Sequence, residues 1–218
     1  MKAIVTGDII GSRKLINQEI WLHPLKDLLA TWGERHKTWT LDRGDYFQIE
    51  IKNPENALKN ALEIKALIRG VSPQNAQKKT SPIDVCLAIG IGEETFAGET
   101  IHENNGPAYI YSGERFDLQK KEGITMGIKS HWAEFDDEIN LYLKLACTFM
   151  DHWTINSAQL ISIILEHPGI SQAETGRRLG IKQNSVSGRG NRAHLREILE
   201  VENTFRKRIK MYRHAGSD

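Results

Sequence analysis

Along the first part of the chain, hydrophobic patterns typical of β-strands alternate with patterns typical of α-helices. Short β-branched or alternating runs and one nearly continuous apolar run predict four strands, at residues 2–6, 38–41, 46–51 and 83–92. Between the first two runs, apolar residues from Trp21 to Trp32 share one helical face. A second helical pattern begins at Pro54, after the capping residue Asn53, and continues to Arg69. The predicted order is therefore βαββαβ.

This order is the split βαβ pattern of ferredoxin-like folds. It places the first and fourth strands in the middle of an antiparallel sheet, with both helices on one side. Gly44, between the second and third strands, permits the tight reversal of a hairpin. Further patterns predict polar loops at 70–82 and 93–106, helices at 107–121 and from 134 to about 150, and a strand at 124–129. We expect an α+β domain over residues 1–150.

After residue 150 the pattern changes to helices separated by short turns. Residues 156–167 have the apolar face of a packed helix, and a second helix begins at Ser171, which has capping-box spacing with Glu174. A third segment from Lys182 completes a helix, tight turn, helix arrangement. No Gly/Ser-rich linker precedes these helices, so a continuous helix could join the two parts. We expect residues 151–218 to form an all-α, winged helix-turn-helix domain.

The composition is that of a globular chain, with 39% hydrophobic and 26% charged residues among 218. It excludes wholesale disorder, and no apolar run is long enough to suggest a membrane span or a secretory signal. Cys86 and Cys147 lie in apolar or helical patterns without metal-ligand spacing, so we expect reduced core thiols. The expected location is cytoplasmic, with no membrane partner.

The formal charge of +1 hides an asymmetry between the two parts. Residues 1–150 carry 18 basic and 21 acidic side chains, whereas residues 151–218 carry 11 and 7. The later cations crowd between Arg177 and Arg213. Such a basic face is what a polyanion such as DNA requires, although a solvated helix face has the same composition.

Two aspartates mark the first candidate site. Asp8 follows the first predicted strand and Asp45 lies in the hairpin turn, so a βαββαβ sheet should bring both carboxylates to one edge. With the carbonyl of Ile9, these oxygens suit Mg²⁺ or Mn²⁺. Backbone N–H groups and two cations of the turns could hold a nucleotide, at Gly7, Gly11, Ser12, Arg13, Lys14 and Gly44. The competing interpretation is that each Asp and Gly only shapes its turn.

Three segments also carry a resemblance to a known family. GDIIGS, RGDYFQI and CLAIGIGE, in that order, look like the core motifs of class III nucleotide cyclases and their polymerase-palm relatives, over roughly residues 1–130. With the helix-turn-helix, the whole chain resembles the SatD-like family of bacterial proteins. The resemblance implies that Asp8 and Asp45 bind metal.

The sequence departs from the cyclase pattern at two places. Leu41 stands where such cyclases carry a base-reading lysine, and Ile110 or Tyr111 stands where they carry an asparagine. Arg115 alone matches the catalytic arginine that steadies the transition state. This incomplete pair favours nucleotide binding over turnover.

The helix-turn-helix is the second candidate site. The spacing from Ala173 through Gly180 to Val186 resembles the small residue, turn and inward apolar residue of bacterial winged helices. The residues expected to contact DNA are Arg177, Arg178, Gln183, Asn184, Ser185, Ser187, Arg189 and Arg192. The alternative is a helical bundle that merely packs on the sheet. Gly188 and Gly190 each lower helix stability by about 1 kcal/mol, so the recognition helix could end or kink there.

These features together suggest a two-domain bacterial regulator that binds DNA and whose cyclase-like domain binds nucleotide with a divalent metal. The alternative is an enzyme that makes a nucleotide messenger from NTP, with the C-terminal module as a regulatory or dimerisation device. A third possibility is that the first domain is only a scaffold. The apolar stripe from Leu195 to Ile209 is typical of helix packing and could close a homodimer.

Overall fold

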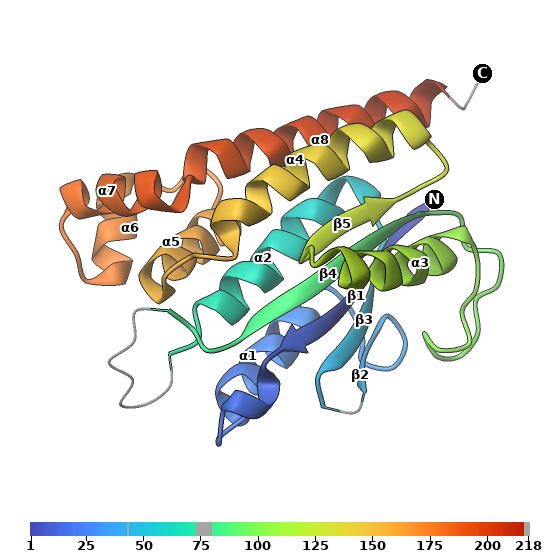
Figure 1. The fold of residues 1–218 in the computed structure, drawn as a ribbon, viewed down its shortest axis with the longest axis horizontal. Helices are drawn as coiled ribbons and strands as arrows, with labels where there is room; N and C mark the ends of the chain where they lie inside the picture. Colours follow the sequence, from blue (N-terminus) through green and yellow to red (C-terminus); the bar gives the residue numbers. More distant parts are fainter. Residues whose placement is uncertain (43, 73–79, 216–218) are drawn as a thin grey trace.

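Five strands form a single mixed sheet in the computed structural model, which describes residues 1–42, 44–72 and 80–215, with side chains up to Arg213. The strands are β1 (Lys2–Ile10), β2 (Trp39–Asp42), β3 (Tyr46–Ile51), β4 (Asp84–Gly92) and β5 (Met126–Lys129), in the order β2-β3-β1-β4-β5 (Figure 1). Neighbouring strands are antiparallel except β4 and β5, which are parallel. The predicted position of the hairpin beside β1 is confirmed. Residues 73–79 of the predicted polar loop lie outside the described residues.

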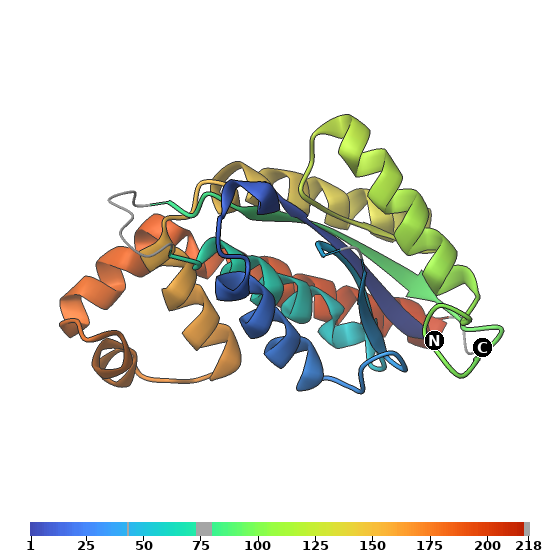
Figure 2. The same cartoon turned by 90° about the horizontal axis from the view of Figure 1, so that it is seen from below.

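Helices cover both faces of the sheet. One face packs against α1 (Glu19–Ala30), α2 (Ala57–Arg69) and α4 (Ala133–Met150), whose apolar side chains share one large core with the strands. The other face carries α3 (Pro107–Glu122), which contacts Cys86 and Ala88 through Phe116. Two 3₁₀ helices, η1 (Ser12–Lys14) and η2 (Pro54–Asn56), precede α1 and α2. Figure 2 shows α3 on the opposite side of the sheet from α1 and α2, so the two helices of the predicted βαββαβ unit share a face as expected.

Small residues allow α3 to lie directly on β4. A Cβ at Gly90 would stand 2.1 Å from the carbonyl oxygen of Ala108 and 2.3 Å from the amide nitrogen of Ser112. The outer edge of β5 is occupied by Asn140 of α4. Its amide accepts from the Ile128 N–H at 2.8 Å and donates to the Ile128 carbonyl at 2.9 Å. These bonds satisfy the edge strand at a position where another strand would otherwise pair.

The chain continues as four helices, α5 (Ile155–Glu166), α6 (Gln172–Leu179), α7 (Gln183–Ala193) and α8 (Leu195–Ala215). α5 packs on α2, and α8 runs back along α4 (Figure 1). A single residue, His194, separates α7 from α8, and its φ of 54° is left-handed. Residues of α5, α7 and α8 belong to the same hydrophobic core as the sheet. The core is therefore continuous across residue 150.

Two expectations for this region are wrong. Leu195–Ala215 is a helix, so no β-hairpin wing follows α7. The apolar stripe on this helix is used within the chain, because Ile198 is 1% exposed and Phe205 is fully buried. Phe205 contacts Phe135 of α4, with ring centroids 5.8 Å apart. The stripe therefore does not offer the homodimer surface that the sequence suggested.

A fully buried lysine joins the sheet to the C-terminal helices. The Nζ of Lys65, on α2, lies 2.8 Å from Asp84 Oδ1 and 2.6 Å from Asp151 Oδ1. It also donates a hydrogen bond to Thr125 Oγ1 at 3.1 Å. Asp84 opens β4, and Asp151 directly follows α4. Breaking a buried ion pair costs about 3–5 kcal/mol, so this cluster fixes the junction of α4 and α5 against the sheet.

Both cysteines are free and buried, as expected. Burial raises the pKa of the Cys86 thiol and of the Cys147 thiol. A raised pKa keeps these thiols protonated near neutral pH, where the reactive species is the thiolate. Of the helices in the described part of the chain, none combines the length and the apolar character needed to cross a lipid bilayer.

Candidate functional site

β1 is longer than the sequence predicted. It runs to Ile10, so Gly7 and Asp8 lie within the strand and not in the loop after it. Asp8 is in register with Tyr46 of β3. A Cβ at Gly7 would lie 2.1 Å from Cζ of Phe47, so the glycine makes room for this buried ring. Gly7 therefore has a packing role and does not belong to the loop that was expected to hold a nucleotide.

The structure brings Asp8 and Asp45 to the same end of the β1–β3 pair. The Ile9 N–H, next to Asp8, donates to the backbone carbonyl of Asp45 at 3.1 Å. The side chains have different partners. Asp8 Oδ2 lies 3.2 Å from Lys120 Nζ, whereas Asp45 Oδ2 accepts a hydrogen bond from the Ser12 hydroxyl at 3.0 Å. Each carboxylate is therefore stabilised by a separate donor.

The oxygen atoms at this end of the sheet suit a hard divalent cation. In an antiparallel pair the N–H and C=O of one residue point towards the same neighbouring strand, so the Ile9 carbonyl faces the hairpin as its N–H does. Carboxylate and carbonyl oxygens are the ligands that Mg²⁺ and Mn²⁺ prefer. Within residues 1–42, 44–72 and 80–213, no group of three or more His, Cys, Asp or Glu side chains converges on one point. An ion here would therefore need further ligands from water or from a bound phosphate.

The turns around the aspartates contain the other predicted nucleotide contacts. Gly11 has a φ of 77° and Gly44 a φ of 91°, so both occupy the left-handed conformation that favours glycine. Both glycines therefore shape the turns in which they lie. Arg13 and Lys14 are exposed on η1, directly after β1.

Arg115 is not brought to the aspartates. Its guanidinium lies over β5, where a Cβ at Gly127 would come within 2.1 Å of the Arg115 Nε, and its Nη2 is 3.4 Å from Glu122 Oε2. One strand, β4, lies between β5 and β1. The cation that meets Asp8 is Lys120, which the sequence analysis missed. The available signal was its spacing of four residues from Phe116, on the helix face towards β1 and β3.

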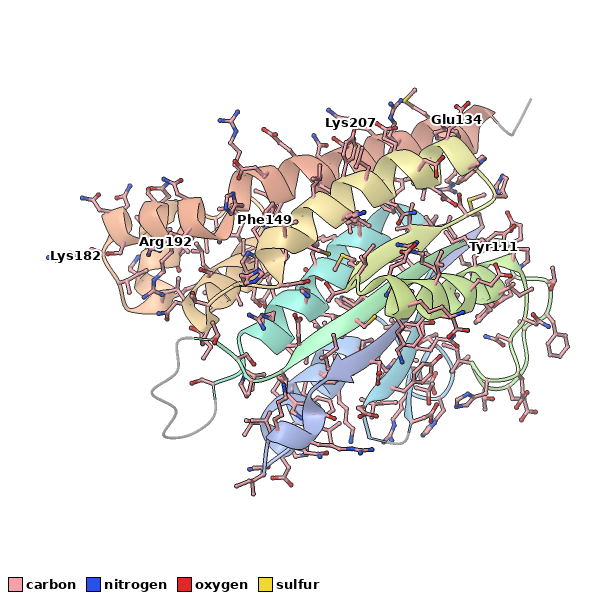
Figure 3. The ribbon with its side chains drawn as sticks, in the orientation of Figure 1. Tyr111, Glu134, Phe149, Lys182, Arg192 and Lys207 are labelled. Atoms are coloured by element: carbon pink, nitrogen blue, oxygen red, sulfur yellow. The ribbon has the colours of Figure 1, made fainter. Side chains whose placement is uncertain are left out.

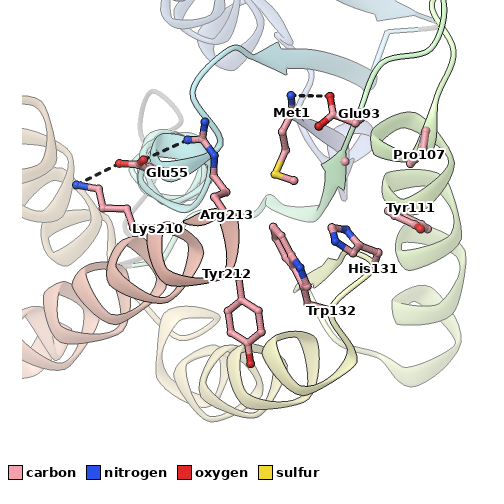
Figure 4. Close-up of a pocket in the computed structure, with 11 residues that line it drawn as sticks. Met1, Glu55, Glu93, Pro107, Tyr111, His131, Trp132, Lys210, Tyr212 and Arg213 are labelled. Carbon is pink, nitrogen blue, oxygen red and sulfur yellow. Dashed lines mark hydrogen bonds and ion pairs between the residues drawn. The ribbon is translucent and has the colours of Figure 1, made fainter. Parts of the chain in front are cut away.

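A cavity of about 850 Å³ lies at the opposite end of the sheet, between α3, α8 and the turn before α4 (Figure 4). Its charged groups are paired with one another. Lys210 Nζ is 3.3 Å and Arg213 Nη1 is 3.2 Å from Glu55, and the N-terminal amine is 2.7 Å from Glu93. The cavity therefore presents neutralised charges beside the ring of Trp132.

The small residue that lets α6 and α7 pack closely is not Ala173, which the sequence pattern predicted. Ala173 is exposed, whereas Gly176 is buried. A Cβ at Gly176 would lie 2.7 Å from the Ile181 carbonyl oxygen and 3.5 Å from Val186 Cγ2. Gly180, with a φ of 64°, ends α6. The small residue of the motif is thus Gly176.

α7 presents a polar and basic surface. Its exposed residues are Gln183, Asn184, Ser185, Ser187, Asn191 and Arg192, and Arg189 is partly exposed. The helix contains no acidic residue and runs unbroken from Gln183 to Ala193, so the expected end or kink at Gly188 or Gly190 is wrong. Figure 3 shows Lys182 and Arg192 at the end of the molecule formed by α6 and α7.

The cations of the motif differ in how they are neutralised. On α6, both Arg177 and Arg178 form ion pairs with Glu174. Within the described part of the chain, the ion pairs do not include Arg189 or Arg192 of α7. The two arginines of α6 are therefore neutralised inside the chain. On α7, the Ser187 hydroxyl donates to Gln172 Oε1 at 3.0 Å, whereas Arg189 and Arg192 form no ion pair among the described residues.

Comparison of the chain with protein-family models, with curated proteins and with solved structures finds no match.

Proposed function

We propose that the protein is a transcriptional regulator that binds duplex DNA through the helix-turn-helix of α6 and α7. The observation that carries the proposal is the surface of α7, which exposes amides, hydroxyls and two arginines and holds no carboxylate. A structural bundle would need no such bias. A DNA-binding surface does need an excess of cations, because each phosphate contacted by a cation releases counterions.

The two kinds of contact come from different parts of α7. Gln183, Asn184 and Ser185 occupy its first turn, from which a recognition helix reaches base edges in the major groove. Arg189 and Arg192 lie further along and would contact phosphates, which fix the register without reading sequence.

The salt dependence of DNA affinity tests this proposal. If about six phosphates are contacted, affinity should fall ~10³-fold between 50 and 200 mM salt. The double variant Arg189→Ala, Arg192→Ala should weaken binding and reduce the salt slope by about two. Lys207→Ala removes an exposed cation from α8 and serves as the control. Equal affinity of both variants and the parent chain would favour the structural bundle.

The sheet supports a second function, the binding of a divalent cation with a nucleotide by a ferredoxin-like, cyclase-related domain. The supporting observation is that Asp8, Ile9 and Asp45 lie at the same end of the β1–β3 pair, and that the exposed Arg13 and Lys14 follow directly after β1. Binding of Mn²⁺ and of each NTP can be measured by calorimetry. Asp45→Asn should abolish metal-dependent nucleotide binding because it removes one anionic ligand at nearly constant volume.

The cyclase alternative has less support. The one arginine that matches the cyclase pattern, Arg115, lies over β5 and is paired with Glu122. We therefore expect no pyrophosphate release when the protein is incubated with Mg²⁺ or Mn²⁺ and each NTP. Release that depends on Asp45 would instead establish an enzyme.

A further inference from the structure

Arg115 is a buried cation with few partners. Its side chain is 10% exposed, and Glu122 is its ion-pair partner among the described residues, at 3.4 Å. The Nε is buried and has no acceptor. A guanidinium carries five N–H donors, and a buried donor without an acceptor is costly. The site therefore has unused capacity for an anion.

The position of this guanidinium is fixed by the strand beneath it. Gly127 of β5 has no Cβ, and one added there would lie 2.1 Å from Arg115 Nε and 2.7 Å from Cζ. The guanidinium therefore rests against the bare backbone of β5. Asn140, beside it, is held by both of its bonds to Ile128. These contacts make a rigid floor between α3 and α4.

A cavity of about 400 Å³ opens above this floor. Arg115, Glu122 and Ile124 line it from the side of α3, and Asn140, Leu141 and Lys144 line it from α4. Lys144 is exposed, and Leu141 is 55% exposed although it is apolar. The cavity thus combines two cations, one displaceable carboxylate and an apolar wall.

We propose that this cavity binds the phosphate group of a small phosphorylated molecule, with the guanidinium of Arg115 and the ammonium of Lys144 as its charge partners. Arginine forms paired hydrogen bonds with phosphate, and the second cation matches its second negative charge. Ile124 and Leu141 contact the organic part. In the free protein the Glu122 carboxylate pairs with the Arg115 guanidinium, so an incoming phosphate competes with this carboxylate. The site is separate from Asp8 and Asp45 and needs no metal.

Calorimetry with inorganic phosphate and with phenyl phosphate, both in EDTA, tests the proposal on the full chain. Glu122→Gln should tighten phosphate binding by about threefold or more, because it removes the competing charge. Lys144→Gln and Gly127→Ala should weaken it by at least the same factor, the second by displacing the guanidinium. Lys121→Gln removes an exposed cation of α3 that does not line the cavity and should have no effect. Asp45→Asn should also leave binding unchanged.

The two probes distinguish a free phosphate from a phosphate monoester. Tighter binding of phenyl phosphate supports a ligand with an organic part on Leu141, and equal binding supports a site for the anion alone. The proposal is overturned if neither probe binds, or if Lys144→Gln and Glu122→Gln both leave affinity unchanged. The side chains of Lys144 and Glu122 lie at the surface, so these two variants remain informative even if Gly127→Ala fails to fold.

Discussion

Lys120 Nζ lies 3.2 Å from Asp8 Oδ2 and 4.3 Å from the centre of the Phe116 ring. One ammonium group therefore contacts both an aromatic face and the carboxylate that was expected to bind metal. Because Lys120 is 49% exposed and Asp8 is 28% exposed, this is a surface ion pair, worth about 0.2–1 kcal/mol. A divalent cation at Asp8 must compete with it.

Removal of this lysine should strengthen metal binding. In Lys120→Met the Asp8 carboxylate loses its cation, and the affinity for Mn²⁺ should rise by up to about fivefold, the equivalent of ~1 kcal/mol. Calorimetric titration measures the change. Lys121→Met, one residue along α3, is the control for net charge. An unchanged or weaker Mn²⁺ affinity in Lys120→Met would contradict a metal site at Asp8.

The glycines of the helix-turn-helix should respond to alanine in opposite directions. At Gly176 a Cβ would lie 2.7 Å from the Ile181 backbone oxygen, so Gly176→Ala should destabilise the protein by about 1–3 kcal/mol. At Gly188 the nearest atom to a Cβ is the mobile end of Arg192, 3.5 Å away. Gly188→Ala should therefore stabilise the protein by about 0.5–1 kcal/mol, as expected in a helix interior.

Urea unfolding of each variant measures these changes. Gly190→Ala is a matched control, because a Cβ there meets Leu195 and Leu160 at ordinary van der Waals distances of 3.5–3.8 Å. It should behave like Gly188→Ala. If Gly176→Ala were as stable as the parent chain, α6 and α7 would not be in the close contact described above.

The sequence was sufficient to predict the arrangement of the first four strands, because their hydrophobic periods and the turn at Gly44 act locally. The placement of Asp8 and Asp45 at one end of the sheet followed from this order. The length of β1 was underestimated. Gly7 and Asp8 resemble turn residues in isolation, and only the packing of Phe47 shows why a glycine continues the strand.

Side-chain contacts between elements far apart in the sequence could not be predicted in this way. Whether Arg115 or Lys120 meets Asp8 depends on the rotation of α3, which is set by the close approach of its backbone to Gly90. The course of α8 was likewise missed. Its apolar stripe has the same periodicity whether it packs on another chain or, as here, against Phe135 of α4.

The stability of the helical interface should depend on pH through Glu63 of α2. Burial raises the pKa of this carboxyl above its ordinary value of 4.5, and the charges of Glu166 and Glu202 add to the increase, although Lys59 opposes it with an ion pair at 2.9 Å. Since the folded state favours the protonated form, the contribution of Glu63 to stability is fully present below the unfolded pKa and is lost as pH rises through the folded value.

Glu63→Gln should therefore raise the free energy of unfolding at pH 7, and this gain should shrink as the pH falls towards 4.5. Urea titrations at several pH values measure both effects. Glu134→Gln, at an exposed position on α4, is the control and should show neither. A loss at pH 7 would show that the ion pair with Lys59 outweighs burial, and a gain that is constant with pH would show that the titration of Glu63 does not contribute to stability.

Trp153 connects the junction after α4 to the end of α7. Its indole N–H donates to the Ala193 carbonyl, the last residue of α7, at 2.9 Å, and its own carbonyl accepts from Arg69 of α2 at 2.8 Å. Arg69 in turn lies 3.8 Å from Asp84 at the start of β4. A continuous chain of polar contacts thus runs from the sheet to α7, without a flexible linker.

This series of polar contacts should couple the sheet to DNA binding. Trp153→Phe removes the bond to Ala193 and should lower DNA affinity by about threefold or more, within the ~0.5–2 kcal/mol that such intermediate residues can transmit. It should also reduce any effect of bound nucleotide on DNA affinity, which linkage requires to be reciprocal. Trp39→Phe is the matched control, because its indole also donates to a backbone carbonyl, that of Gly33, at 3.1 Å. Both variants should lose about 1–3 kcal/mol of stability, but only Trp153→Phe should weaken DNA binding. Equal DNA affinities for the two variants would show that α7 is held in place without this contact.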